Sequence, residues 1–248
     1  MALPPVQYLG GTLPRSWRRP TKELVEKYLE HLREGLAPPS AQHLYAPSMT
    51  ATAADLRSSA VRRGTNMLEA YTRPGSGSPL SAVGMAYPQL AQASSRSVRI
   101  LAAQSGMAAE LRDQDRGQNV ITLVNPSYRP IRNRGQRLRR EACFSGPGFA
   151  VEVMRWNEIV LIFPDQPSKQ VGGTDAWILQ HEIDHLDGKI CADVAREQKR
   201  RLYFVPPERS TPFYKADTIP TSWPIFPWEQ YEAMKTGAFD LAAFARYL

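Results

Sequence analysis

Length, composition and charge place this chain among globular proteins. It has 248 residues, of which 42% are hydrophobic and 22% charged, and its formal net charge is +7. These values are typical of a soluble protein with one large domain or two small ones. No run approaches the roughly 18 apolar residues that a membrane-spanning helix needs, so we expect no contact with a membrane.

The N-terminal residues 1–20 are predicted to be irregular, and they lack the apolar core of a signal peptide. Their arginines, with no acidic residue before Glu23, give them some similarity to a transit peptide, although their prolines disfavour the amphipathic helix that such a peptide forms. The chain's two cysteines, Cys143 and Cys191, are predicted to be free thiols, because a chain of this size does not need a disulfide. We expect Cys191 to pack in the core.

Two helices are predicted in the first third of the chain. Residues 21–35 carry an apolar stripe at helical spacing, with Thr21 as the N-cap and Gly35 at the end. After a second predicted helix at 53–71, the segment 74–79 is expected to be a loop. The buried face of the second helix is expected to include Leu56, Val61, Met67 and Leu68.

Short apolar runs predict the strands. Two strands are expected at 97–103 and 120–124, with a turn at 125–126 after the second. A further strand or hairpin is expected at 152–163. The stretch 155–181, which includes the end of this segment, looks short for two full strands of a hairpin.

Six arginines lie close together shortly before Cys143: Arg129, Arg132, Arg134, Arg137, Arg139 and Arg140. The run predicts a solvated loop or hairpin. The alternative is a surface that contacts phosphate or another acidic partner. No aromatic interleaving accompanies the run, so the solvated interpretation is favoured.

Residues 180–188 read QHEIDHLDG and contain the pattern His-Glu-x-x-His, on a helix predicted over 175–187. Residues four apart on a helix lie on one face, so His181 and His185 can bind one metal ion together. Glu182 is then placed to take a proton from a water on that metal. By itself the pattern also fits a polar surface helix.

The third ligand has to come from elsewhere, because catalytic sites of this kind commonly use three protein ligands and keep one position open. Cys143 is the best candidate, in the segment 141–148 that reads EACFSGPG. A thiolate is a strong ligand, and the pKa of the thiol falls when it binds a metal.

A last helix is predicted within 228–248.

Three segments, in the same order, resemble the peptide deformylase family. The family carries Gly-x-Gly-Leu-Ala-Ala-Pro-Gln, Glu-Gly-Cys-Leu-Ser and Gln-His-Glu-x-Asp-His-Leu-x-Gly. This chain has AVGMAYPQ at 82–89, EACFS at 141–145 and QHEIDHLDG at 180–188. Three motifs in order are far more specific than His-Glu-x-x-His alone.

The resemblance implies a domain organisation and a fold. A deformylase-like catalytic domain is expected over 43–200, with an N-terminal extension at 1–42 and a C-terminal extension at 201–248. The expected fold class is α+β, in which a central metal-binding helix packs against small antiparallel β-sheets.

The activity implied by the resemblance is hydrolysis of the formyl group from N-formylmethionyl peptides of nascent proteins, with release of formate. One divalent metal ion would be bound by Cys143, His181 and His185; it would be Fe²⁺ in the cell, and Zn²⁺, Ni²⁺ or Co²⁺ in preparations. Glu182 would be the general base and acid. Two donors would hold the developing oxyanion, namely the side chain of Gln89 and the backbone N–H of Phe144.

The resemblance also implies supporting and substrate-binding residues. Glu141 is expected to contact the metal ligands without binding the metal itself. The substrate-binding residues are expected to be Val83, Gly84 and Met85 beside the peptide backbone, Arg155 near the peptide, and Trp177 and Ile178 at the methionine pocket.

The chain departs from the family pattern through bulkier residues, Tyr87, Phe144 and Trp177, at positions near the expected site. We therefore hypothesise an altered substrate preference. An alternative is a deformylase-like protein that acts mainly by binding a partner, with 129–140 and both extensions as interaction surfaces, for example for a ribosome. Glu182 and Gln89 favour the enzyme, because a purely structural metal site needs neither.

A generic His-Glu-x-x-His protease is a weaker interpretation, which Cys143 and Gln89 disfavour. Formylated methionine starts proteins in bacteria and in organelles. The segments outside the family pattern favour a mitochondrial location, with a bacterial cytoplasm as the alternative.

Overall fold

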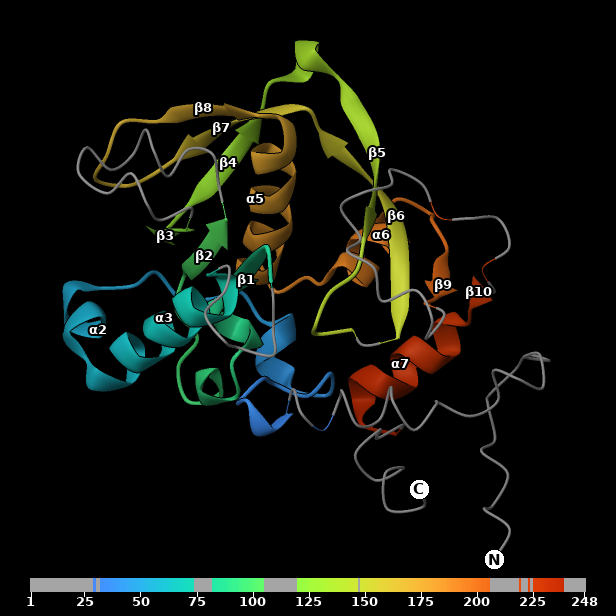
Figure 1. Cartoon of the computed structure of the whole chain (residues 1–248), viewed down its shortest axis with the longest axis horizontal. Coiled ribbons are helices and arrows are strands. Elements are labelled where there is room, and N and C mark those ends of the chain that lie inside the picture. Colours follow the sequence, from blue (N-terminus) through green and yellow to red (C-terminus); the bar gives the residue numbers. More distant parts are fainter. Residues whose placement is uncertain are drawn as a thin grey trace, which may run out of the picture. The chain divides into compact units, whose positions relative to one another are not determined.

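The computed structural model describes residues 29, 32–73, 82–104, 120–146, 148–205, 219, 223 and 225–238 (Figure 1). These residues form two compact units. The α5 unit contains residues 42–138 and 154–190, and the α7 unit contains residues 139–153, 191–248 and 1–41 as far as they are described. The domain boundaries predicted from the sequence, after residues 42 and 200, differ from this division. They stay a prediction. Among the described helices, none combines the length and apolar character needed to span a membrane.

Several predicted elements lie partly or wholly outside the described residues. Most of the helix expected at 21–35 is among them, as are the loop at 74–79 and residues 239–248 of the expected terminal helix.

The helix predicted at 53–71 is two helices, α2 at Ala53–Arg57 and α3 at Ser59–Thr72. A capping box starts α2, because Thr52 and Asp55 exchange backbone-to-side-chain hydrogen bonds. Ser58 is extended, at φ −60° and ψ 133°, and separates the two helices. Val61 and Leu68 are buried as predicted. Leu56 is 40% exposed, so its predicted burial was wrong. The reason is the break at Ser58, which changes the direction of the helix face on which Leu56 lies. Met67 is half-buried.

Two three-stranded antiparallel sheets belong to the α5 unit. One has the order β1-β2-β3, formed by Gly84–Ala86, Ile100–Gln104 and Val120–Val124. The other has the order β4-β7-β8, formed by Ser127–Pro130, Glu158–Ile162 and Lys169–Gly172. The strand expected at 120–124 is confirmed, and the one expected at 97–103 starts at Ile100.

The segment expected to be a strand or hairpin at 152–163 belongs to two sheets. Its first part is the end of β6, Phe149–Trp156, and its second part is β7. The stretch before His181 does hold a hairpin, contrary to expectation, because β7 and β8 are short and pair from Glu158↔Gly172 to Leu161↔Lys169.

Helix α5, Gly173–Leu186, packs against both sheets of its unit and lies centrally in it (Figure 1). Its apolar residues join those of the strands in one buried cluster: Ala86, Leu101, Ala103, Ile121, Leu123, Ile159, Leu161, Val171, Ala176, Ile178, Leu179, Ile183 and Leu186. Burial of this apolar surface holds the helix in place. The predicted α+β fold with a central helix on small antiparallel sheets is confirmed.

The α7 unit is built around the sheet β10-β9-β6-β5, whose other strands are Gln136–Glu141 (β5), Leu202–Phe204 (β9) and Ile225–Phe226 (β10). Its described residues include the helices α6 at Cys191–Glu197, which was not predicted, and α7 at Trp228–Thr236. The ring of Phe149 packs against those of Phe226 and Tyr231, with centroids 5.4 and 5.8 Å away. Gly237, at φ 77°, ends α7 in the left-handed conformation. Cys143 and Cys191 are buried free thiols, as predicted.

The arginine-rich segment runs from β4 through the short turn η5, Arg132–Arg134, into β5. Its first four arginines are exposed, and the last two are half-buried. This is the solvated arrangement that the sequence favoured.

Candidate active site

The His-Glu-x-x-His residues lie in the C-terminal half of helix α5. The helix begins two residues before the predicted 175–187 span and ends one residue before its end. His181 and His185 lie one turn apart, with ring centroids 5.1 Å from each other. His185 is fully buried, and Glu182 is 3% exposed. Buried polar groups of this kind require partners, which favours a functional site over a polar surface helix.

Gln180 fixes the orientation of α5 just before the first histidine. Its Oε1 accepts the backbone N–H of Trp156 at 2.9 Å, and its Nε2 donates to the Trp156 carbonyl at 2.9 Å and the Ala176 carbonyl at 2.8 Å. The side chain therefore joins the helix to the end of β6. This role was not predicted from the sequence, although Gln180 lies within the family motif at 180–188.

The C-terminal end of α5 is held by Arg99 of the segment before β2. Its Nη1 donates to the Leu186 carbonyl at 3.1 Å and to Asp187 at 2.7 Å, and its Nη2 donates to the Pro126 carbonyl at 2.9 Å. Gly188 follows at φ 76°, and a Cβ there would lie 2.7 Å from the backbone of Ala46. Only glycine fits this close approach.

A buried ion pair joins α5 to β6. The Nη1 atom of Arg155 lies 2.5 Å from Oδ2 of Asp184, and their side chains are 4% and 13% exposed. A buried pair is costly to break, because the remaining charge has left water without compensation. Asp184, another residue of the motif, was not identified from the sequence. The predicted contact of Arg155 with substrate stays a prediction.

Glu182, the predicted general base, packs against the backbone of β1. A Cβ on Gly84 would lie 2.6 Å from Oε1 of Glu182 and 2.8 Å from its Cγ. Glycine at this position therefore leaves the space that the carboxylate occupies. Gly84 was predicted as a substrate-binding residue, and the structure adds this contact with Glu182.

Gln89 ends the short 3-10 helix η3, Tyr87–Gln89, and is buried. Its Oε1 accepts the backbone N–H of Ala86 at 2.8 Å. Because Oε1 is the acceptor in this bond, Nε2 is the atom of the amide that can donate elsewhere.

Nearby, Nε2 of His43 lies 3.2 Å from the Leu90 carbonyl, and burial lowers the pKa of His43. A neutral imidazole can still donate this bond.

The bulky Tyr87 is accommodated by helix α3. Its ring is 2% exposed, and a Cβ on Gly64 would lie 2.5 Å from its Cε2. Burial raises the pKa of the Tyr87 phenol, despite the nearby charge of Arg63. The bulk at this position is therefore taken up by a glycine of α3.

The remaining predicted substrate-binding residues of the α5 unit differ in exposure. Met85 is fully buried and pairs with Ala102. Ile178 belongs to the buried cluster, and Val83 packs on that cluster while partly exposed. Trp177 is partly exposed. The substrate contacts expected of these residues stay predictions.

Cys143 lies in the turn after β5, in the α7 unit. The backbone N–H of Ser145 donates to its Sγ at 3.4 Å, and the N–H of Gly146 donates to its carbonyl at 3.0 Å. An N–H directed at sulfur stabilises a thiolate. Glu141 is buried and Phe144 is half-buried.

Cys143, His181 and His185 each offer one ligand atom, and these atoms lie within 4.8 Å of one another. A thiolate with two imidazoles is a donor set that suits zinc or iron. The residues present therefore fit a divalent metal ion, and the predicted metal ligands are brought together.

Comparison with known proteins identifies the family. The sequence model described as Polypeptide deformylase matches residues 42–201. The peptide deformylase of Chlorobaculum parvum is 30% identical over 149 residues, which are 58% of this chain and 72% of the relative. That of Chlorobium limicola is 31% identical over 141 residues, which are 55% of this chain and 67% of the relative.

A solved structure supports the fold. The K3U-bound class I type b peptide deformylase from Acinetobacter baumannii has a TM-score of 0.51 and 21% sequence identity, and the match covers 64% of this chain and 97% of that one. The family match over 42–201 contains all three motifs and the Cys-His-His ligand set. This chain is therefore a member of the peptide deformylase family.

Proposed function

We propose that the chain hydrolyses the formyl group of N-formylmethionyl peptides and releases formate. The observation that carries the proposal is a buried Glu182 beside two imidazoles on α5, in a chain that matches the deformylase family over 42–201. A binding protein with a structural metal site has no need of a buried carboxylate beside its ligands.

A divalent metal ion held by Cys143, His181 and His185 would supply Lewis acidity and activate water near neutral pH. The residues of the chain perform the proton transfers. Glu182 accepts a proton as water attacks the formyl carbon, and it then donates that proton to the leaving amine of the peptide.

The developing negative charge on the formyl oxygen needs hydrogen-bond donors. Gln89 is suited to this task, because the bond from Ala86 N–H to its Oε1 leaves the amide N–H₂ as the end that can donate to substrate. The Phe144 backbone N–H is the second proposed donor. Loss of one such donor typically costs about 2.7–4 kcal/mol of barrier.

The test is release of formate from formyl-Met-Ala-Ser by the full chain, loaded anaerobically with Fe²⁺. We expect turnover by the parent and none by the Glu182→Gln variant, although both retain one metal ion per chain. A Glu182→Gln variant with parental turnover would contradict the proposed base. No turnover by a metal-loaded, folded parent would contradict the activity.

The native metal is proposed to be Fe²⁺, with Zn²⁺, Ni²⁺ or Co²⁺ as substitutes in preparations. The mixed sulfur and nitrogen ligand set supports an ion of this group over Mg²⁺ or Ca²⁺, which prefer oxygen. Loading the same chain with each metal and comparing kcat tests the assignment. Highest activity with Zn²⁺ would contradict it.

Substrate preference is proposed to differ from that of relatives with smaller residues near the site. Trp177, which is partly exposed on α5, is the residue that supports this proposal. We expect Trp177→Leu to raise kcat/KM on formyl-Met-Ala-Ser, while Tyr87→Phe, whose ring lies against Gly64, leaves kcat/KM unchanged. Equal rates for parent and Trp177→Leu would refute the proposal.

The cellular setting is also a proposal. Mitochondrial location is supported by the basic segment 1–20, which lies outside the family match, and fluorescence microscopy of the tagged full chain tests it against a cytoplasmic location. Contact of segment 129–140 with a ribosome is supported by its four exposed arginines. Co-sedimentation with ribosomes should be weakened by Arg129→Glu with Arg132→Glu, and parental co-sedimentation would contradict this contact.

A further inference from the structure

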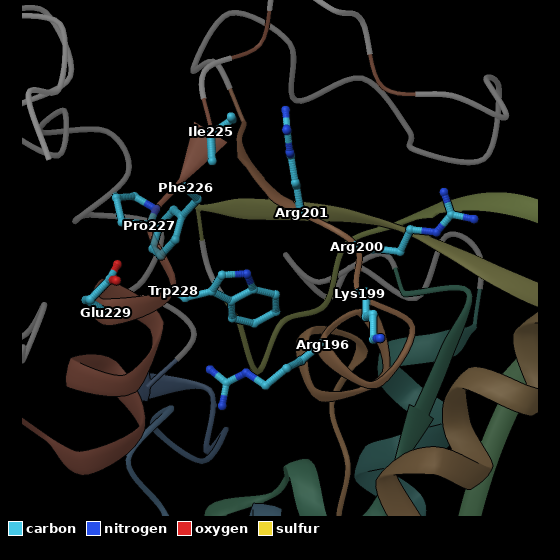
Figure 2. Close-up of a pocket in the computed structure, with 9 residues that line it drawn as sticks. All are labelled: Arg196, Lys199, Arg200, Arg201, Ile225, Phe226, Pro227, Trp228 and Glu229. Carbon is cyan, nitrogen blue, oxygen red and sulfur yellow. The ribbon is translucent and has the colours of Figure 1, made fainter. Parts of the chain in front are cut away.

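A second site lies in the α7 unit, where the segment after α6 faces β10 and the start of α7 (Figure 2). It is a pocket of about 470 Å³, a volume in the usual range of ligand sites. Its lining residues are of two kinds, basic and apolar, with one acid: Arg196, Lys199, Arg200 and Arg201; Ile225, Phe226, Pro227 and Trp228; and Glu229. None of them has a role in the deformylase chemistry proposed above.

The basic residues are held at the end of α6 by the backbone. The N–H of Lys199 donates to the Arg196 carbonyl at 2.9 Å, and that of Arg200 donates to the Ala195 carbonyl at 2.8 Å. Lys199 has φ 55°, a left-handed conformation in which glycine or asparagine is usual. A lysine at this position keeps the row of three cations from 199 to 201 unbroken.

The cations spread out instead of converging. In Figure 2 the side chains of Arg196, Arg200 and Arg201 point in different directions from the backbone. A site for one phosphate group needs donors that meet at a point, as in a backbone nest or a bidentate clamp. A spread of cations instead suits a chain of phosphates, which carries one charge per nucleotide.

The apolar side of the pocket offers a flat aromatic surface. The guanidinium of Arg196 lies over the Trp228 ring at 4.5 Å from its centroid, and it pairs with Glu232 at 2.5 Å. Both side chains of that ion pair are close to half exposed, so the pair is weak. Ile225, at 50% exposure, extends the apolar surface. Proteins bind single-stranded nucleic acids with this combination of aromatic rings, arginine planes and backbone-tracking cations.

We propose that this pocket binds a segment of single-stranded RNA, with phosphates on Lys199, Arg200 and Arg201 and a base on Trp228 or on the Arg196 plane. An acidic peptide would satisfy the charges but would make no systematic use of the partly exposed Trp228 ring and the exposed Ile225 side chain. The proposal does not depend on the deformylase activity.

Fluorescence anisotropy on the full chain tests it, with a labelled single-stranded RNA of about 12 nucleotides, a length within the site sizes of such proteins. Two charge variants are compared: Arg200→Glu with Arg201→Glu in the pocket, and Arg57→Glu with Arg62→Glu as a control. The control arginines are exposed on α2 and α3 and give the same change of net charge.

We expect the pocket variant to bind RNA about tenfold or more weakly and the control to bind like the parent. The slope of log K against log salt concentration should become shallower by about 1.4, because two phosphate contacts are lost at roughly 0.7 each. Ile225→Ser, at an exposed position, should weaken binding without that change of slope. Turnover of formyl-Met-Ala-Ser should stay parental in all these variants, so failure of either proposal is distinguishable from failure of the other.

Several results would overturn the proposal. One is equal loss in the pocket and control variants, which would mean diffuse attraction to a basic protein. Another is competition by AMP as strong as that by unlabelled RNA, which would indicate a mononucleotide site. A third is equally strong competition by an acidic peptide of the same charge, which would indicate a site for acidic peptides. Unchanged binding in the pocket variant would overturn it directly.

Discussion

At the scale of single residues, the candidate active site depends on glycines as well as on reactive side chains. The carboxylate of Glu182 occupies the space that a side chain on Gly84 would fill, and the ring of Tyr87 occupies the space above Gly64. In both cases a glycine in one element determines where a large side chain of another element lies.

Gly84→Ala should therefore damage catalysis more than folding. The new Cβ would displace the Glu182 carboxylate, and general acid-base groups typically contribute about 10²–10⁴-fold, so we expect kcat/KM to fall by about 100-fold or more. The matched control is Gly172→Ala, whose Cβ would lie 3.2 Å from the side chain of Glu158 and 3.8 Å from the backbone oxygen of Asn157. Steady-state kinetics on metal-loaded protein is the measurement, and parental activity of Gly84→Ala would refute this account.

Asp55 is expected to make the stability of the fold depend on pH. Its hydrogen bond with Arg96 first, and then those with Thr52, hold its pKa far below the usual range. A carboxyl with a lowered folded-state pKa stabilises the fold above its unfolded pKa of about 3.9, and this contribution is lost as pH falls towards the folded-state value.

Asp55→Asn should lower Tm at pH 7, and the difference from the parent should shrink as pH falls below about 4. Thermal unfolding followed by circular dichroism between pH 7 and pH 3 measures the difference. Asp165→Asn, at an exposed position outside the described helices and strands, serves as the control. A difference in Tm that does not change with pH would contradict the assigned role.

At the scale of elements, α5 is held by polar contacts at three levels as well as by its apolar face. Gln180 binds the end of β6, Asp184 pairs with Arg155, and the Leu186 carbonyl accepts from Arg99. These contacts fix both the rotation and the axial position of the helix that carries the histidines.

Breaking the Arg155–Asp184 pair should be costly in either direction. We expect Arg155→Met and Asp184→Leu each to lower the free energy of unfolding by about 3–5 kcal/mol, because each leaves a buried charge without its partner. The double variant should lose less than the sum. The exposed pair Arg134–Glu158 is the control, where Arg134→Met should cost less than about 1 kcal/mol. Urea unfolding measures all of these, and additive losses would show that the pair is not coupled.

At the scale of the whole molecule, the motifs identified the site better than periodicity identified the elements. The three segments at 82–89, 141–145 and 180–188 predicted the ligand set that the structure brings together. The strand at 120–124 and the central helix also followed from the sequence. The two-helix break at Ser58 did not, because one extended residue leaves the apolar spacing nearly unchanged.

Other features depend on contacts between distant residues and leave little local trace. The pairing of β7 with β8 is fixed by register, and their short length hid the hairpin from a length argument. Helix α6 is too short for periodicity to show it clearly. The anchoring by Gln180 and Arg155 requires the strand and the helix to be next to each other, which the sequence order does not reveal.

Removal of the metal should affect the stability of the whole chain. An ion that binds only the folded state stabilises it by mass action, so treatment with a chelator should lower Tm and abolish turnover together. The Glu182→Gln variant should show the same fall in Tm, since it keeps all three ligands. Calorimetry with and without chelator is the measurement, and an unchanged Tm would contradict metal binding at this site.

The amide of Gln180 has one further consequence. It offers one acceptor and one donor group to Trp156, as a residue on a neighbouring strand would, so the helix is attached to β6 by a side chain that imitates backbone. Hydrolysis of that single amide to a carboxylate would hardly change the volume of the side chain, but it would replace the donating Nε2 by an oxygen that faces the carbonyls of Trp156 and Ala176. The alignment of the histidines therefore depends on this side chain being an amide, and neither Glu nor an aliphatic residue could replace its bonds.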